Sequence, residues 1–523
     1  MIAVHEDLPD DVAALRALLL AERVRHASEL AERDSRLERI MALLQTLRRA
    51  QFGRRSEKLD PAQLSLALED LEIAIAAAQA DKDKQVRTRS TPRTTAATKR
   101  APLPAHLPRI ERVLAPDSTV CPCCSEALHL IGEDRSERLD VIPAQYRVLV
   151  TRRPKYACRA CEGAVVQAPA PARLIEGGLP TEATVAHILV NKYANHLPLY
   201  RQWQILARQG IEIDRSNLAL WVGRSAFLLA PLVDRMLELL KGSAKLFCDE
   251  TRAPVLDPGR GRTKTGYLWA IARDDRPWGG ADPPAVVYRY APGRGAEHAL
   301  RHLAGFAGIL QVDGYSGYKA LTDPARPGGA ISLAYCWSHF RRQFYEIAKG
   351  GNAPIADQAL ARIALLYAVE NTIRGRPASQ RQAVRQQCSR PLVDALFIWL
   401  EAQRRLVPRG SKIADAIGYG FNHQVGLRRF LEDGRIEIDS NVVERTIRPI
   451  ALNRKNSLFA GHDEGGIHWG VVASLIETCK LHDVEPQAYL TDVLTKLVEG
   501  WPMRRIDELL PWVSAQRGDR LAG

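Results

Sequence analysis

Two stretches of sequence decide the fold, Lys245-Leu-Phe-Cys-Asp-Glu-Thr251 and Gly308-Ile-Leu-Gln-Val-Asp-Gly-Tyr315. Each contains a short apolar run with the length of a buried β-strand, and each run ends at an aspartate, Asp249 or Asp313. Two further strand patterns, at 266–273 and 285–290, follow the first stretch after turns rich in Gly and Pro. A helix at about 296–304 and strands at 308–312 and 331–336 complete the predicted order.

Three strands, a helix and further strands are the order of a ribonuclease-H-like fold, in which acids stand at the ends of the first and fourth strands. Asp249 and Asp313 fall at these two places. Residues 353–432 are mainly helical in pattern and too long for a loop, so we expect a helical insertion. Another acid, Glu444, lies in a helix predicted to start near Asn441.

Three carboxylates of this kind can hold two divalent cations, which is the arrangement that phosphodiester hydrolysis and transesterification require. We expect Asp249 to bridge two Mg²⁺ (or Mn²⁺) ions, with Asp313 on one ion and Glu444 on the other. Taken singly, each acid has a structural interpretation. Asp313-Gly314 suits a turn, Glu250 can replace Asp249 as the functional acid, and Glu444 has the spacing of a helix cap or of an ion pair with a later arginine.

Two Cys-x-x-Cys pairs predict a zinc site. They are Cys121/Cys124 and Cys158/Cys161, separated by a segment in which residues 146–151 alternate well enough to form a hairpin. Two such knuckles supply the four thiolates of a closed, structural zinc site. The nine cysteines are an odd number in a large chain without an export signal, which favours metal ligands over disulfides.

The amino-terminal region is predicted to be helical. Leu30, Leu37 and Leu44 recur every seven residues, which is typical of a coiled coil, although a plain amphipathic helix fits equally well. From residue 84 to residue 110 the chain has seven basic residues and no acidic one, which predicts a flexible basic linker. Such a linker can follow DNA phosphates or serve equally well as a solvated tether.

Residues 181–226 have a helical pattern interrupted near Gly210, and a second helix is predicted to start near Asp214. This layout is that of a helix-turn-helix, in which Arg215 and Asn217 would face DNA. Four basic residues around Glu444 suit phosphate contacts: Arg445, Arg448, Arg454 and Lys455. We expect His339 to be a buried, hydrogen-bonded core residue, and the alternative is a role near the metal site.

The charge balance also favours a nucleic-acid partner. Lys and Arg number 73 against 60 Asp and Glu, a formal net charge of +13 over 523 residues. Basic residues gain affinity for a polyanion by releasing its counterions. No apolar run approaches the roughly 20 residues that span a bilayer, and the amino terminus has no signal-peptide pattern. We therefore expect a cytoplasmic protein with no membrane contact.

Motifs along nearly the whole chain resemble the transposases of insertion sequence 66 type elements, a group of DDE transposases. The motifs are Gln51-Phe-Gly-Arg-Arg-Ser-Glu-Lys58, Cys121-Pro-Cys-Cys124, Cys248-Asp-Glu-Thr251, Val312-Asp-Gly-Tyr-Ser-Gly-Tyr318, Cys336-Trp-Ser-His-Phe-Arg-Arg342, Glu437-Ile-Asp-Ser-Asn441, Leu458-Phe-Ala-Gly461 and Ser474-Leu-Ile-Glu-Thr478. The family often has Asp-Asn-Asn where this chain has Asp439-Ser-Asn441. Glu437 and Asp439 are close enough in sequence to compete with Glu444 for the role of third acid.

The resemblance implies binding to the terminal inverted repeats of double-stranded transposon DNA, Mg²⁺-dependent cleavage and attack of the exposed 3′-hydroxyls on target DNA. It also implies accessory proteins of the same element, and we expect a homo-oligomer. Two alternatives remain: a ribonuclease-H-fold nuclease without strand transfer, and a non-catalytic, zinc-containing DNA-binding remnant.

The predicted organisation is multidomain α+β and has six parts. They are a leucine-zipper-like helical region (1–80), a basic linker (81–115), a zinc-binding domain (116–172), a helix-turn-helix region (173–240), a ribonuclease-H-like core (241–468) with its insertion at 353–432, and a small carboxy-terminal domain (469–523).

Overall fold

The computed structural model describes residues 11–13, 16, 19–20, 22–23, 145–157, 165–175, 178–257, 262–457 and 459–516. The chain divides into two compact units, residues 1–141 and 142–523. In the first unit, described positions between 12 and 23 are helical and exposed. The heptad leucines, the basic linker and all four predicted zinc ligands lie outside the described residues.

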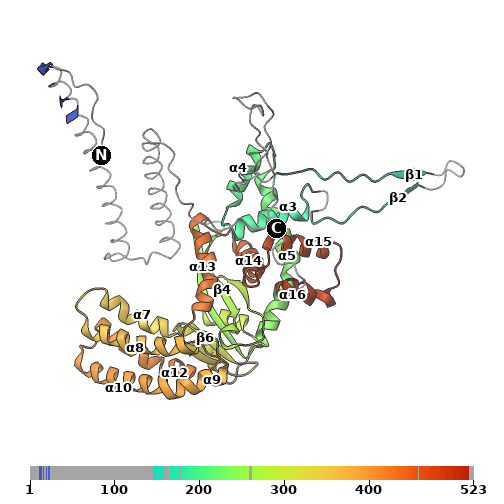
Figure 1. Cartoon of the computed structure of the whole chain (residues 1–523). Coiled ribbons are helices and arrows are strands. Elements are labelled where there is room, and N and C mark those ends of the chain that lie inside the picture. Colours follow the sequence, from blue (N-terminus) through green and yellow to red (C-terminus); the bar gives the residue numbers. More distant parts are fainter. Residues whose placement is uncertain are drawn as a thin grey trace, which may run out of the picture. The chain divides into compact units, whose positions relative to one another are not determined.

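A five-stranded sheet organises the second unit (Figure 1). Its strands are β3 (Lys245–Asp257), β4 (Arg262–Arg273), β5 (Ala285–Ala291), β6 (Ile309–Val312) and β7 (Ser332–Tyr335), in the order β5-β4-β3-β6-β7. The first three strands are antiparallel, whereas β6 and β7 run parallel to β3. Helix α6 (Ala296–His302) separates β5 from β6. The predicted strands and the helix between them are confirmed.

The first strand is longer than the sequence pattern predicts. It does not end at Asp249 but continues to Asp257, because β4 pairs with it from Phe247 to the pair Asp257 and Arg262. The pairing of β3 with β6, by contrast, ends at Phe247. The prediction that Asp249 ends its strand was therefore wrong where β3 pairs with β4. Asp249 does lie just beyond the last residue of β3 that pairs with β6.

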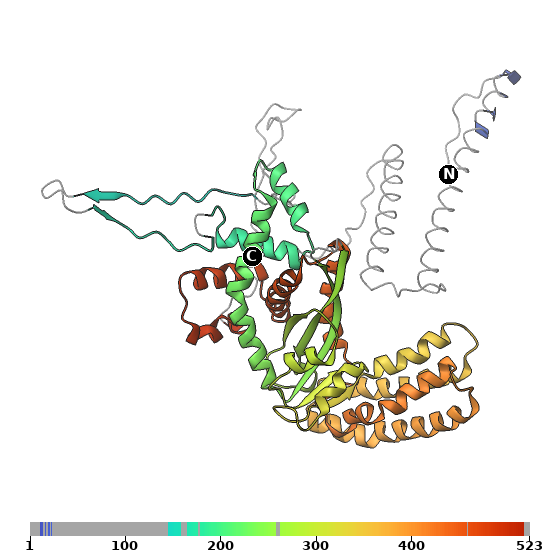
Figure 2. The same cartoon turned by 180° about the vertical axis from the view of Figure 1, so that it is seen from behind.

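Two long helices cover the antiparallel side of the sheet. Helix α5 (Arg215–Lys241) packs on β5 and on α14 (Asp463–Leu481), which itself lies along β5 (Figure 2). Helix α13 (Asn441–Asn456) packs instead against β3 and β4. By length and composition α5 is apolar enough to cross a membrane. Its buried residues include Leu229, Leu232 and Met236, which belong to the main core, so it packs as a core helix.

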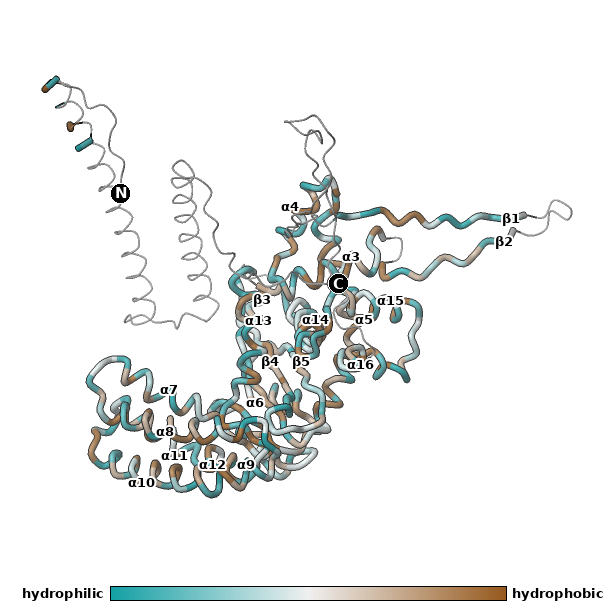
Figure 3. The backbone as a smooth tube through the Cα atoms, in the orientation of Figure 1, coloured by the Kyte–Doolittle hydropathy of each residue, from teal (hydrophilic) through white to brown (hydrophobic). Residues whose placement is uncertain are grey.

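The helices predicted at 353–432 are confirmed, and they belong to a second hydrophobic core. Helix α7 (Trp337–Ala348) is followed by α8 (Pro354–Ile373), α9 (Ala378–Val384), α10 (Arg390–Leu406), α11 (Lys412–Asn422) and α12 (Gln424–Glu432). Phe340, Phe397 and Phe430 are among the buried side chains that hold these helices together. Hydrophilic and hydrophobic residues alternate along α10, as expected of an amphipathic helix with one apolar side (Figure 3).

The predicted break between two helices near Gly210 is also confirmed. Helix α3 (Glu182–Tyr193) precedes α4 (Leu199–Arg208), and α5 starts directly after Asp214. The Asp214 carboxylate accepts a hydrogen bond from the backbone N–H of Ser216 at 2.7 Å, which caps the helix. Gly210 adopts a φ of 76°, a conformation that favours glycine at this turn.

The hairpin lies elsewhere than predicted. Residues 146–151 form no strand, and the side chains of Val148, Leu149 and Val150 are exposed. The strand pair is β1 (Lys155–Ala157) with β2 (Val165–Gln167), which run antiparallel. The alternation at 146–151 misled because Val148, Leu149 and Val150 have no second layer on which to pack.

Candidate functional site

The parallel register of three strands places three chemically distinctive residues in one row. Phe247 pairs with Gln311, and Gln311 pairs with Ala334. Two residues further along each chain stand Asp249, Asp313 and Cys336. Neighbouring strands are about 4.8 Å apart, so this register brings the two predicted aspartates side by side and adds a thiol that the sequence analysis did not select.

Asp249 sits in an environment that disfavours its charged form. Burial raises the pKa of its carboxyl to about 7, and repulsion from Glu250 and Asp313 acts in the same direction. The backbone N–H of Glu250 donates to Asp249 Oδ1 at 2.8 Å and offsets part of this effect. Carboxylates crowded in this way gain stability from a nearby cation. The donor set therefore suits a divalent metal ion.

Glu250, the predicted rival of Asp249, is engaged in other contacts. Its side chain is fully buried and forms an ion pair with Arg294, and the Tyr318 hydroxyl also donates to it at short range. Arg294 stacks over the Tyr315 ring, 3.8 Å from the ring centroid, and its Nη2 lies 3.8 Å from Asp313 Oδ2. Arg294 thus brings a positive charge to the edge of the carboxylate row.

Asp313 lies in the row with Asp249 and also shapes a turn, which was the alternative interpretation of this residue. Its Oδ1 accepts a hydrogen bond from the backbone N–H of Tyr315 at 2.8 Å, which shapes the turn after β6. The other oxygen, Oδ2, faces Arg294. The side chain of Asp313 retains 19% of its exposure, so a solvent-borne ligand can reach it.

Glu444 reaches the same region from α13. Its Oε1 lies 3.7 Å from Nδ1 of His339 and accepts a hydrogen bond from the Ser440 hydroxyl at 3.1 Å. His339, in turn, is close enough to Asp249 to act on its carboxyl electrostatically. One ligand atom from each of Cys336, His339 and Glu444 lies within 4.8 Å of the others. His339 therefore interacts with both Glu444 and Asp249.

The two acids that competed with Glu444 have structural partners. Glu437 Oε1 accepts a hydrogen bond from the buried Arg381 at 2.7 Å, and its backbone pairs with the side chain of Gln311. Asp439 accepts hydrogen bonds from the backbone and side chain of Asn441, at 3.2 and 2.7 Å, at the start of α13.

The interpretation of His339 as a buried, hydrogen-bonded core residue was wrong. Its side chain is 29% exposed, and its Nδ1 atom is itself buried without a hydrogen-bond partner. The sequence signal that could have found it is the Cys-x-x-His spacing at the start of α7, which places the imidazole one turn after Cys336.

The predicted DNA-contacting residues lie at two places. Arg215 and Asn217 are exposed in the first turn of α5, where the Arg215 guanidinium lies 5.9 Å from the centroid of the Tyr200 ring. On α13, Arg445 and Lys455 are exposed. The other two residues on α13 are half-buried: Arg448, and Arg454, whose Nη1 donates to the Arg252 carbonyl at 2.6 Å.

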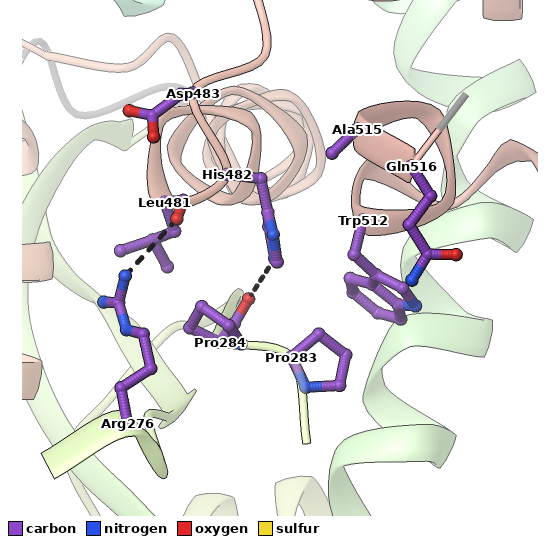
Figure 4. A pocket seen from close by; sticks show the side chains of 9 residues that line it. All are labelled: Arg276, Pro283, Pro284, Leu481, His482, Asp483, Trp512, Ala515 and Gln516. Carbon is purple, nitrogen blue, oxygen red and sulfur yellow. Dashed lines mark hydrogen bonds between the residues drawn. The ribbon is translucent and has the colours of Figure 1, made fainter. Parts of the chain in front are cut away.

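A hollow of about 280 Å³ lies away from these acids (Figure 4). It is lined by the connection between β4 and β5 and by carboxy-terminal residues that include His482 and Trp512. The Nε2 atom of His482 contacts the Pro284 carbonyl at 2.7 Å. Asp249, Asp313 and Glu444 are not among the residues that line it, so this hollow and the carboxylate row are separate features.

Three curated relatives from Sinorhizobium fredii (strain NBRC 101917 / NGR234) match nearly the whole chain. The "Uncharacterized protein y4qI" is 45% identical over 98% of both chains, and y4jD is 45% identical over 97% of both. A third, y4hP, is 36% identical over 90% of this chain and 87% of its own. Their names state no activity.

Family models match four segments in order. They are described as "Transposase C of IS166 homeodomain" at 39–112, "zinc-finger binding domain of transposase IS66" at 118–162, "Transposase IS66 family" at 177–468 and "IS66 C-terminal element" at 474–512. The zinc-finger segment contains Cys121, Cys124, Cys158 and Cys161, which supports Zn²⁺ as a ligand of this chain. The central match spans α3 to the start of α14 and includes the carboxylate row, and on this evidence the chain belongs to the IS66 transposase family, which acts on DNA.

Proposed function

We propose that this chain is a DDE transposase that binds the terminal inverted repeats of its element, cleaves the DNA and joins the 3′-hydroxyls to a target. The observation that carries the proposal is the adjacency of Asp249 and Asp313 across β3 and β6, with Glu444 joined to them through His339. The sheet order β5-β4-β3-β6-β7 supports a ribonuclease-H-like core, because it consists of an antiparallel first half followed by two parallel strands.

Asp249, Asp313 and Glu444 are the residues that would hold two Mg²⁺ (or Mn²⁺) ions. The fit rests on the donor set: three carboxylates at one end of the parallel strands and a buried imidazole nitrogen without a partner. Bound there, the ions would lower the barrier by activating the attacking oxygen and stabilising the leaving one. Asp249 would serve both ions, because the charges of Asp313 and of His339 both act on its carboxyl.

The remaining residues position the DNA. Arg294 lies against Asp313 with 39% of its side chain exposed, so it can contact a phosphate that approaches the row. Arg445 and Lys455 present charge on the same helix as Glu444, and Arg448 and Arg454 complete the set. Arg215 and Asn217 at the start of α5 would contact DNA as part of a helix-turn-helix.

The other parts of the proposal concern assembly. The four cysteines would hold a structural zinc ion, because closed four-thiolate sites normally lack an open coordination position. A homo-oligomer would place two DNA ends in one complex, and accessory proteins of the element would act with it on nucleoid DNA in a bacterial cell.

The test is cleavage and joining of a labelled duplex that carries the element's terminal repeat, with Mg²⁺ and the full chain. Asp249→Asn, Asp313→Asn and Glu444→Gln are expected to lose both reactions while still binding the duplex. Asp439→Asn is the matched control and is expected to keep both, because its amide oxygen can still accept the hydrogen bond from the backbone N–H of Asn441. Cleavage without joining would favour a ribonuclease-H-fold nuclease, and binding alone, even with accessory proteins added, would favour a DNA-binding remnant.

A further inference from the structure

The cation position at Glu444 has donors that a purely magnesium-binding site does not need. Cys336 Sγ, His339 Nδ1 and a Glu444 oxygen lie within 4.8 Å of one another. They come from adjoining elements: Cys336 directly follows β7, His339 lies in the first turn of α7, and Glu444 lies in the first turn of α13. Sulfur, nitrogen and oxygen donors therefore converge on one point.

The Nδ1 atom of His339 lacks a hydrogen-bond partner. The atom is buried and forms no hydrogen bond, and its nearest charged neighbour, Glu444 Oε1, is 3.7 Å away, beyond hydrogen-bond distance. A buried polar atom without a partner is unfavourable, because it has lost its hydrogen bonds to water. A cation between the imidazole and the carboxylate would satisfy both groups.

The surrounding contacts hold these donors in place. The Ser440 hydroxyl donates to Glu444 Oε1 at 3.1 Å, and the backbone N–H of the same serine donates to Cys336 Sγ at 3.2 Å. The backbone N–H of Trp337 donates to the Ile438 carbonyl at 3.0 Å, which ties the start of α7 to the segment before α13. One short segment thus positions all three donors, as supporting hydrogen bonds do at metal sites.

Ligand type decides which ion such a site takes. Carboxylates suit Mg²⁺ and Mn²⁺, imidazole suits transition metals, and thiols select softer ions such as Zn²⁺. We propose that His339 Nδ1 and Glu444 bind the same divalent cation, with Cys336 Sγ as a third donor, so that this position prefers transition metals such as Mn²⁺ and Zn²⁺ over Mg²⁺. The inference rests on the proposed two-cation function, which it deepens by assigning the ion at Glu444.

The experiment uses the full chain with its zinc module saturated and Mn²⁺ as the probe. Electron paramagnetic resonance counts bound Mn²⁺, and electron spin-echo envelope modulation detects an imidazole nitrogen coordinated to it. The wild type is expected to show nitrogen modulation. His339→Gln should abolish it and weaken Mn²⁺ binding at least about 10-fold, because losing even a hydrogen-bond partner of a ligand costs about 10–100-fold in affinity. The matched control His462→Gln should leave both unchanged.

Two further variants keep the test decisive if His339→Gln folds poorly. Glu444→Gln should weaken the same nitrogen-coordinated ion through a different donor. Cys336→Ser should leave Mn²⁺ affinity nearly unchanged but reduce the ability of Zn²⁺ to displace Mn²⁺, because only the softer ion gains from sulfur.

The outcomes separate this inference from the proposed function. Mn²⁺ that binds in an Asp313-dependent way, without nitrogen modulation in the wild type, would overturn the role of His339 and leave the carboxylate chemistry standing. If neither the wild type nor any variant bound Mn²⁺ with or without DNA, both proposals would fail.

Discussion

Two hydroxyl side chains of α14 accept hydrogen bonds from the backbone at the outer edge of the sheet. On edge strand β5 the backbone N–H of Tyr288 donates to Ser474 Oγ at 2.8 Å, and that of Val286 donates to Thr478 Oγ1 at 3.2 Å. Thr478 Oγ1 also donates back to the Val286 carbonyl at 3.1 Å. Both hydroxyl residues are fully buried. Unpaired strand edges invite intermolecular pairing, so these contacts close the edge.

The double variant Ser474→Ala/Thr478→Val should therefore destabilise the sheet. It leaves two buried N–H donors without acceptors, at about 1–3 kcal/mol each, or about 2–6 kcal/mol together. Urea unfolding of the full chain should show the loss, and hydrogen–deuterium exchange should quicken most at Val286 and Tyr288. Aggregation should also increase, because the freed edge can pair with another chain.

A matched control separates the edge contact from the loss of a hydroxyl in a helix. Thr495 in α15 (Pro486–Val498) donates to the carbonyl one turn earlier at 2.8 Å, much as Ser474 does. Thr495→Val should change stability by no more than about 0.5 kcal/mol. If the double variant cost no more than this control, the strand edge would not depend on the two hydroxyls.

Three further predictions concern charge and metal. Glu370→Gln should lower the free energy of unfolding by about 3–5 kcal/mol, because the fully buried Arg385 loses a bidentate carboxylate with both contacts at 2.7 Å. Arg390→Met breaks an exposed ion pair in the same insertion and should lower it by less than about 1 kcal/mol. Equal rates of hydrogen–deuterium exchange in the two variants would contradict this. Burial, reinforced by nearby positive charge such as that of Arg289, lowers the pKa of His302 to about 3, below its ordinary 6.5. As the pH falls, the unfolded chain therefore binds a proton at this histidine before the folded chain does. The contribution to the free energy of unfolding is fully present above pH 6.5 and falls by about 2 kcal/mol towards pH 5. In urea titrations at pH 8 and pH 5, His302→Gln should reduce the difference in stability, and an unchanged difference would refute the role of His302. Elemental analysis should find zinc in the wild type and lose it in Cys158→Ser.

Local pattern was sufficient for most of the elements. Apolar runs bounded by Gly and Pro predicted β4 to β7, because a strand buried on both faces must be apolar along its length. The extent of β3 was missed, since its last residues follow Pro254 and are held by their long antiparallel partner. The hairpin at 146–151 failed for the opposite reason, because alternation without a packing partner does not make a strand.

The row of site residues depends on register, which no local pattern contains. Asp249 and Asp313 were selected because each follows an apolar run, but Cys336 joins them only through the pairing of β6 with β7. The ion pair of Glu250 with Arg294 likewise connects residues on separate elements. A sequence pattern identifies residues capable of chemistry, whereas long-range pairing decides which of them meet.

The third acid illustrates this division most clearly. Glu437, Asp439 and Glu444 have similar side chains and lie within one short stretch, so sequence alone offers no means to choose among them. Arg381, which the helical insertion contributes, engages the first, and the start of α13 engages the second. Glu444 lies one helical turn later, on the side of α13 that faces His339. The insertion therefore does more than enlarge the domain: by engaging Glu437 with a buried arginine, it leaves Glu444 as the acid of the three that faces His339 beside the carboxylate row.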